Sequence, residues 1–367
     1  MGKWISSTGN TVSILPWTDK GFKFITLDCE EYIGGRIAEG NITLVHDGNE
    51  EALKMITEEN NVTIEFGTRE LGTILTSKGI ILERKYFKNY LSFNFLCVPD
   101  KDFYTRRSTL SYTDIDDAIR SLWKGEIENR TKTDLPKDLQ INQAGEFDSK
   151  FLGTLCTSYR KDAIFALGLE GLLIKDLIGI DSSGNKEPYW TMVSGGHVVQ
   201  DSTLGSEDNF KLTYDYKLYK KPEDPWTESE EENTNTTSVN FDSLLFDNRY
   251  RLVHKDYNIM RRNLYWNQRL YSSKMYNRLH VTHTNFFQLY RLGDVVNYKR
   301  PGEKDVVPFV KYIISGITYH IRTEADPNQF KSDQYPFRID YFMHGLEENG
   351  QVLNDQDPFE QETSDAS

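Results

Sequence analysis

The residues whose spacing first suggests chemistry are two nearby histidines, His280 and His283. On a helix, histidines three positions apart can face one metal ion and bind it through their imidazole nitrogens. The surrounding residues 279–284, however, have the β-branched composition of an extended segment. Side chains three positions apart in a strand point to opposite faces, so the pair would not converge on one ion. The sequence therefore predicts no metal site, and it predicts no cofactor.

Carboxylates are the second group that could act together. The pairs Glu50-Glu51 and Asp116-Asp117 lie in segments with helical patterns, where neighbours point about 100° apart. Two carboxylates that met across strands could still form a glycosidase site. The sequence contains no GxGxxG, P-loop or GxSxG motif, so nucleotide binding and nucleophilic catalysis lack their main support. We expect a protein that is not an enzyme, and the alternative is a glycan-binding or glycan-cleaving protein.

Residues 249–280 combine basic and aromatic side chains. Six of them form the predicted interface: Arg261, Arg262, Tyr265, Trp266, Arg269 and Tyr271. Cations interleaved with rings suit single-stranded nucleic acid, but Arg, Tyr and Trp also dominate protein interfaces. Acidic residues gather in the same chain at 222–237 and 347–367, so charge complementarity between subunits is the simpler explanation. We favour a protein interface, with a single-stranded nucleic-acid binder as a further alternative.

Composition limits the class of protein. The 367 residues include 43 Lys+Arg and 56 Asp+Glu, and this formal charge of −13 disfavours a protein that works mainly on nucleic acid. Aromatic residues make up 13% of the chain, which indicates β-rich structure with large contact areas. The widely spaced Cys29, Cys97 and Cys156 exclude a disulfide framework and are expected to be small core residues in a reducing compartment. We expect neither a standard secretion signal nor a membrane span, because no apolar stretch is long enough.

The hydrophobic period predicts the elements that position these residues. Strands are expected at 22–27, 40–45, 61–66, 78–83 and 90–96, with a helix at 50–56 capped from 47–49. Helices are expected at 112–123 and 147–159, followed by strands at 163–167 and 171–177. Residues 286–321 are strongly β-patterned around a turn at Gly293-Asp294, and 339–343 supply a last strand.

The order of these elements resembles the central hub proteins of contractile-tail phage baseplates and related injection machines. Three motifs support this: a polar lead before a short helix at 140–152, the Leu292-Gly293-Asp294-Val295 turn within 289–297, and the strand pair at 309–321. The resemblance implies a mainly β fold with short helices, containing two tail-tube-like antiparallel β-barrels and a further β-rich domain. The predicted segments are a first barrel (1–108), a second barrel (109–221), an acidic linker or loop (222–238), a late β-rich region (239–346) and a disordered acidic tail (347–367).

The same resemblance implies a function. It predicts a homotrimer that adapts a sixfold tail tube to a threefold spike and forms part of the DNA conduit in the virion baseplate, after assembly in the host cytoplasm. The expected partners are a tail tube or tube-initiator protein, a spike protein and the tape-measure protein. Viral DNA would pass through the lumen without specific binding, and an acidic wall suits this because phosphate contacts are what hold DNA. No catalytic residue is implied. In the same setting, the alternative is a phage-associated glycan-binding or glycan-cleaving protein.

Overall fold

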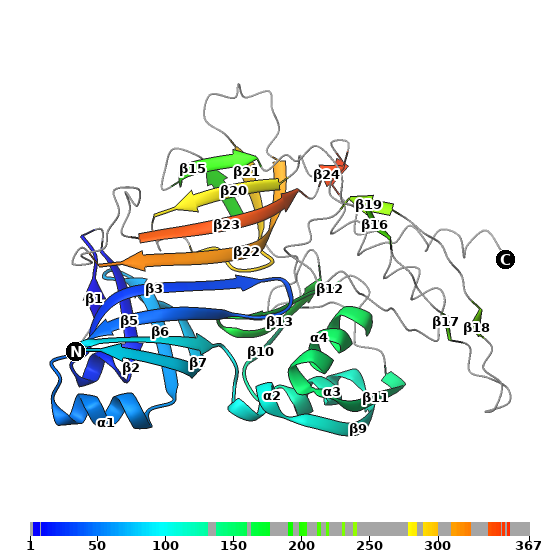
Figure 1. The fold of residues 1–367 in the computed structure, drawn as a ribbon. Helices are drawn as coiled ribbons and strands as arrows, with labels where there is room; N and C mark the ends of the chain where they lie inside the picture. Colours follow the sequence, from blue (N-terminus) through cyan, green and yellow to red (C-terminus); the bar gives the residue numbers. More distant parts are fainter. Residues whose placement is uncertain are drawn as a thin grey trace.

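The computed structural model shows a mainly β protein with short helices, as the sequence predicts (Figure 1). The structure describes residues 3–7, 9–130, 137–159, 163–176, 190–193, 198–203, 211–213, 218–219, 230–231, 238–240, 278–284, 289–299, 310–323, 337–345, 347–348 and 351–352. No helix within these ranges has the length and apolar character needed to cross a membrane.

The N-terminal part of the chain alternates strands around one helix. Its elements are β1 (Trp4–Ile5), β2 (Asn10–Leu15), η1 (Thr18–Lys20), β3 (Lys23–Tyr32), β4 (Gly34–Ile37), β5 (Glu39–Val45), α1 (Glu50–Glu58), β6 (Asn61–Thr68), β7 (Gly72–Phe87) and β8 (Tyr90–Leu96). The five predicted strands are confirmed, although the one expected at 78–83 is the middle of the much longer β7. The predicted cap of α1 is also confirmed, because Asn49 Oδ1 accepts a hydrogen bond from the Ala52 amide at 2.8 Å.

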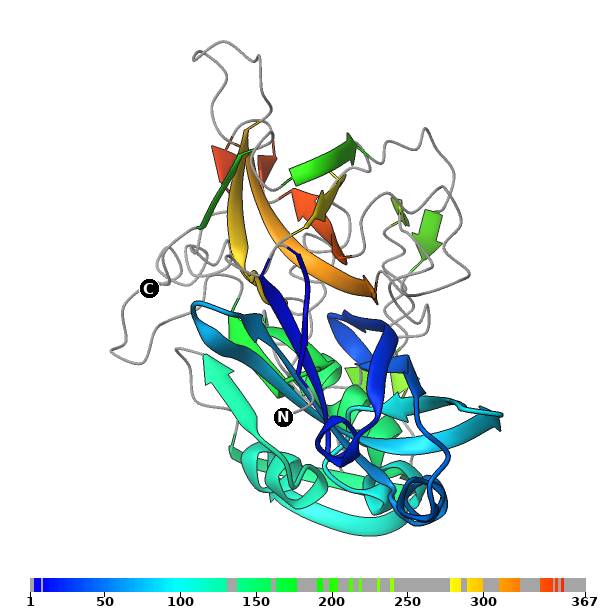
Figure 2. The same ribbon diagram turned by 90° about the vertical axis from the view of Figure 1, so that its left-hand side faces the viewer.

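One large curled sheet joins the two ends of the chain. Among the described residues it has thirteen strands, in the order β1-β2-β6-β7-β8-β5-β3-β22-β23-β20-β15, with β21 paired to β22 and β14 paired to β21. The late strands are β14 (Trp190–Val193), β15 (Val198–Thr203), β20 (Arg278–His283), β21 (Val295–Lys299), β22 (Val310–Arg322) and β23 (Phe337–Gly345). β22 runs antiparallel to β3, with Arg322 opposite Thr26 and Gly316 opposite Tyr32. The late strands therefore continue the N-terminal sheet directly, as Figures 1 and 2 show.

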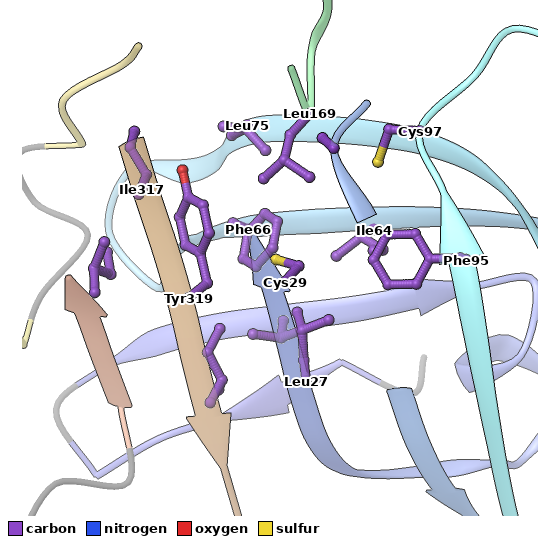
Figure 3. Packing of buried hydrophobic residues seen from close by; sticks show 14 of the residues in the cluster. Leu27, Cys29, Ile64, Phe66, Leu75, Phe95, Cys97, Leu169, Ile317 and Tyr319 are labelled. Atoms are coloured by element: carbon purple, nitrogen blue, oxygen red, sulfur yellow. The ribbon is translucent and has the colours of Figure 1, made fainter. Parts of the chain in front are cut away.

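The main hydrophobic core lies on one face of this sheet (Figure 3). The residues labelled there are Leu27, Cys29, Ile64, Phe66, Leu75, Phe95, Cys97, Leu169, Ile317 and Tyr319. Tyr319 of β22 stacks on Phe66 of β6, with 5.4 Å between ring centroids, so aromatic packing connects the two ends of the chain as well as backbone pairing. Cys29 and Cys97 are free and buried, as predicted, whereas the side chain of Cys156 lies outside the described residues.

A second core lies under a helical unit. This unit contains α2 (Lys101–Thr105), β9 (Arg107–Asp114), α3 (Ile115–Leu122), β10 (Ile127–Arg130), β11 (Lys137–Phe147), α4 (Asp148–Tyr159), β12 (Ala163–Gly168) and β13 (Gly171–Asp176). Strands β10, β13, β12 and β4 form a four-stranded sheet, and the apolar faces of the helices pack with it around Leu122, Leu152 and Leu167. The predicted order of helix followed by hairpin is confirmed for α4, β12 and β13.

Two predicted helix boundaries are wrong. The sequence predicts helices from residues 112 and 147, but residues 112–114 belong to β9 and Phe147 belongs to β11. These two strands pair with each other, so their backbone groups already have partners in the ladder. α3 begins only where Asp114 Oδ1 accepts a hydrogen bond from the Asp116 amide at 2.7 Å. The polar lead of the motif at 140–152 is likewise part of strand β11.

Short strand pairs occupy parts of the predicted linker and tail. β16 (Lys211–Thr213) pairs with β19 (Ser238–Asn240), β17 (Leu218–Tyr219) with β18 (Glu230–Glu231), and β24 (Glu347–Glu348) with β25 (Gln351–Val352). The rest of the segments 222–238 and 347–367 lies outside the described residues. The expected turn at Gly293-Asp294 is present, and Gly293 adopts a left-handed φ of 76° there, which favours glycine.

Gly40 of β5 offers a direct test of how tightly the sheet is packed. A methyl group on Gly40 would lie 2.5 Å from the Asp28 carbonyl oxygen and 2.6 Å from Cys29 Cβ, both on the neighbouring β3. We expect Gly40→Ala to lower the free energy of unfolding by about 1–3 kcal/mol in urea titration, because the backbone must move to relieve the overlap. Thr76→Ala, at an exposed position on β7, is the control and should stay within about 0.5 kcal/mol of wild type. Equal stability of the two variants would contradict this packing.

Candidate functional site

The face of the large sheet opposite the main core carries a continuous polar surface. Cross-strand register aligns six polar residues in one row: Glu83 (β7), Asn94 (β8), Asn41 (β5), Asp28 (β3), His320 (β22) and Arg338 (β23). Two parallel rows flank it: Lys85, Ser92, Thr43, Thr26 and Arg322 on one side, and Glu39, Glu30, Thr318, Asp340 and Thr282 on the other. We call these three rows the polar face. It exists because successive side chains of a strand alternate between the two faces of a sheet.

Neutral side chains form the middle of the polar face. Asn41 Nδ2 donates to Asn94 Oδ1 at 2.7 Å and to Ser92 Oγ at 3.2 Å. Asn94 Nδ2 in turn donates to Glu83 Oε2 at 3.3 Å. These cross-strand bonds satisfy the polar groups within the sheet and fix its register.

The bases on and beside the polar face are paired with acids. Arg322 Nη2 lies 2.7 Å from both carboxylate oxygens of Asp28, and Arg338 Nε lies 2.9 Å from Asp340 Oδ2. Lys85 Nζ lies 3.5 Å from Glu83 Oε1. Arg36 of β4 reaches the edge of the same face, where it pairs with Glu30 and, at 2.7 Å, with Glu39. A phosphate group would have to displace these carboxylates to reach the cations.

Two histidines extend this network across four strands. His320 Nδ1 lies 2.8 Å from Asp28 Oδ1, and its Nε2 lies 3.6 Å from Asp340 Oδ2. His280 Nε2 lies 3.2 Å from Asp340 Oδ1, which also accepts a hydrogen bond from the Thr282 hydroxyl at 2.6 Å. Burial alone would raise the pKa values of Asp28 and Asp340. Hydrogen bonds from His320 and Arg322 to Asp28, and from His280 and Thr282 to Asp340, outweigh burial and hold both pKa values below their usual range.

The predicted arrangement of His280 and His283 is confirmed. β20 is extended, and His280 points to the polar face, where its ring stacks on Phe342 with 4.8 Å between centroids. His283 points to the core, where its ring meets Tyr290 and Tyr341 edge to face. In the described part of the chain, no three His, Cys, Asp or Glu side chains are grouped so that they could hold a metal ion.

The structure does not describe the six residues of the interface predicted from the sequence. Arg261, Arg262, Tyr265, Trp266, Arg269 and Tyr271 are all outside the described residues, so their role stays a prediction. The polar face itself was not singled out from the sequence, although alternation in 26–30, 318–322 and 338–340 is a signal of strands with one polar side. The alternation does not specify which of these distant strands pair with each other.

Glu31 is a buried carboxyl group at the junction of the two cores. Its Oε2 accepts a hydrogen bond from the Leu169 amide at 2.8 Å, in the turn between β12 and β13, and its Oε1 accepts one from the Tyr319 hydroxyl at 3.1 Å. It lines a cavity of about 280 Å³ together with Glu170 and Arg291, which pair with each other at 3.1 Å. Burial raises the pKa of Glu31 to about 7, because the two hydrogen bonds only partly offset the loss of hydration.

We compared the fold with solved structures of known proteins. The structure superposes on a tail protein from Neisseria meningitidis MC58 with a TM-score of 0.54, covering 93% of this chain and 97% of that one at 12% sequence identity. The chain has the fold of tail proteins. The 43 kDa tail protein of prophage MuSo2 from Shewanella oneidensis gives a TM-score of 0.50 at 11% identity, covering 88% of this chain and 98% of that one.

The tail-protein fold is shared with a secretion component. An E. coli protein described as a component of the type VI secretion system, with structural similarity to T4 bacteriophage tail proteins gp27 and gp5, superposes with a TM-score of 0.53. That match covers 94% of this chain and 79% of the E. coli protein at 12% identity. No protein-family model matches the sequence, and no curated protein matches it either. The tail-protein fold therefore rests on three-dimensional similarity.

The raised pKa of Glu31 predicts a specific pH dependence of stability. A carboxyl group whose pKa is higher in the folded state stabilises the fold fully below the unfolded pKa of about 4.5, and this stabilisation is lost as pH rises through about 7. Relative to Glu31→Gln, the free energy of unfolding of wild type should fall by up to about 3 kcal/mol between pH 4.5 and pH 8. Urea titrations across this range measure the difference. Glu58→Gln, exposed at the end of α1, is the matched control and should keep the wild-type pH profile; a parallel profile for Glu31→Gln would contradict the prediction.

Proposed function

We propose that this chain is a structural protein of a phage tail that acts as the homotrimeric central hub of the baseplate and has no catalytic activity. The observation that carries the proposal is the tail-protein fold, which extends over almost the whole chain and almost the whole Neisseria tail protein. The neighbour from a type VI secretion system, described as similar to T4 tail proteins, supports a role in an injection device. The order of sequence motifs at 140–152 and 289–297 supports the same role independently. The strand pair expected at 309–321 is wrong, because residues 310–322 form the single strand β22.

In this proposal the hub adapts a sixfold tail tube to a threefold spike. Its partners are a tail tube or tube-initiator protein on one side and a spike protein on the other, with the tape-measure protein as a further contact. The assembly takes place in the host cytoplasm and the product is part of the virion. The predicted interface in 249–280 joins neighbouring subunits or one of these partners.

The polar face is our candidate for the wall of the DNA conduit. Its bases are held by carboxylates at ion-pair distance, so it offers a hydrated surface with few cations available to phosphate. Binding to duplex DNA depends on cations that neutralise phosphates and release counterions. A face whose bases are already neutralised therefore lets DNA slide without adhering.

The oligomeric state tests the hub proposal. We expect the purified full chain to form particles with three times the mass of the chain in light scattering, and three-lobed rings in negative-stain images. Arg261→Glu plus Arg262→Glu should shift the mass toward that of the monomer, because it reverses charges in the predicted interface. The control Lys54→Glu plus Lys78→Glu makes the same change in charge at exposed positions and should keep the trimer. Compact monomers that turn over glycans would support the alternative function instead.

The ion pairs of the polar face predict how the protein responds to DNA. Wild type should not bind a short DNA duplex in fluorescence anisotropy. Asp28→Asn plus Asp340→Asn should bind it, with log K falling against log salt with a slope of about −2, because Arg322 and Arg338 are released for two phosphate contacts. Adding Arg322→Gln should remove about half of this salt dependence, and thermal unfolding confirms that each variant is folded.

A matched control separates this effect from net charge. Glu58→Gln plus Asp117→Asn removes two acids from α1 and α3, away from the polar face, and should leave DNA binding undetectable. If wild type binds DNA as tightly as Asp28→Asn plus Asp340→Asn, the ion pairs of the polar face do not prevent DNA binding, and the conduit proposal is wrong.

A further inference from the structure

A groove of about 720 Å³ lies between the edge strand β1 and the first residues of β3. Its apolar lining consists mainly of Trp4, Ile5, Phe22, Phe24 and Ile25. The Trp4 and Phe24 rings pack against each other with 5.5 Å between centroids, and Ile5 is 52% exposed at the rim. The volume is in the range of sites that hold small ligands.

Both walls of the groove are strand edges. β1 lies at one edge of the large sheet, and among the described residues it pairs with β2 alone. The pairing of β3 with β22 ends at Thr26, and one further bond runs from the Thr323 amide to the Ile25 carbonyl at 2.8 Å. Within the described ranges, residues 23–24 of β3 therefore have a neighbouring strand, β5, on one side only. Such edges present backbone groups that can pair with another extended chain.

The groove is also positively charged. Lys3 and Lys23 line it, and its lining contains no acidic residue. Neither lysine lies within ion-pair distance of an acid in the described part of the chain. This is the opposite of the polar face, where the bases are paired with carboxylates.

We propose that this groove binds an extended acidic segment of a partner protein, which adds to the sheet as an extra strand. Apolar side chains on one face of the segment pack against Trp4 and Ile5, and acidic side chains pair with Lys3 and Lys23. The backbone of the segment pairs with the open edge of β1 or of β3, as in other cases of strand addition. This function is separate from the hub role and does not depend on it.

A peptide fits the groove better than a nucleic acid. Of the three aromatic rings in the lining, Phe22 and Phe24 are 1% and 4% exposed and cannot stack on bases, which leaves only the partly buried Trp4. Binding of single strands uses successive stacking rings, which this groove does not offer. The walls are strand edges, which recognise a peptide backbone, and the two lysines select its side chains. We therefore expect the partner segment to be extended and to alternate apolar and acidic residues.

Selection from a random peptide library against the full chain tests this. We expect enriched peptides that alternate apolar and acidic residues, and Lys3→Glu plus Lys23→Glu should weaken the best of them by about tenfold. The same variant, used as bait, should enrich basic peptides in place of acidic ones. The control Lys54→Glu plus Lys78→Glu should select the same peptides as wild type.

Hydrogen exchange with the best peptide locates the contact. Binding should protect the amides of residues 4–5 or of residues 23–25, which form the two edges. The proposal is overturned if no peptide is enriched, if enrichment is unchanged by the charge reversal, or if protection appears elsewhere. It is also overturned if single-stranded DNA binds the groove in place of peptides, or if a second copy of the chain occupies it and the peptide no longer binds at high protein concentration.

Discussion

The pairing of β3 with β22 is the contact on which the rest of the structure depends. It joins segments almost three hundred positions apart, as the contact between Asp28 and His320 illustrates. Closing so long a loop costs conformational entropy, which the new contacts must offset. They do so on both faces of the sheet: Tyr319 enters the main core against Phe66, and His320 and Arg322 meet Asp28 on the polar face. Glu31, a buried acid near the end of β3, then connects this sheet to the turn after β12.

Electrostatic pairing gives the molecule two different surfaces. On the polar face the carboxylates of Asp28 and Asp340 remain ionised, because hydrogen bonds from histidine, threonine and arginine outweigh the cost of partial burial. Each exposed pair adds little to stability, yet together they leave few cations for an incoming polyanion. At the groove beside β1, Lys3 and Lys23 form no ion pair with an acid of the described residues, and no acid lines the groove. One surface is suited to letting an anionic polymer pass, and the other to holding an anionic segment.

The tail-protein fold persists at a sequence identity near 12%. Such identity is low enough that the fold must depend on features that many sequences can supply. In the large sheet these are alternation of apolar and polar residues, and a few positions where a side chain does not fit, such as Gly40 beneath the β3 backbone. Function need not follow fold at this distance, so the proposed hub role, which the fold supports, is tested on the residues of this chain, and the proposed peptide groove is argued from those residues alone.

The sequence by itself determined the fold class and most local elements. Alternation in 22–27, 40–45 and 90–96 and the cap at Asn49 are local signals, and the strands and helix α1 form where these signals place them. The helix predicted from residue 112 is wrong at residues 112–114, because strand pairing between β9 and β11 overrides the helical pattern there. Only the tertiary structure decided which strands are neighbours, and with them the polar face, the buried Glu31 and the groove. The physical reason is that strand pairing uses the same backbone groups in every strand, so period-2 alternation specifies which side of a strand is buried but not which distant strand will lie beside it.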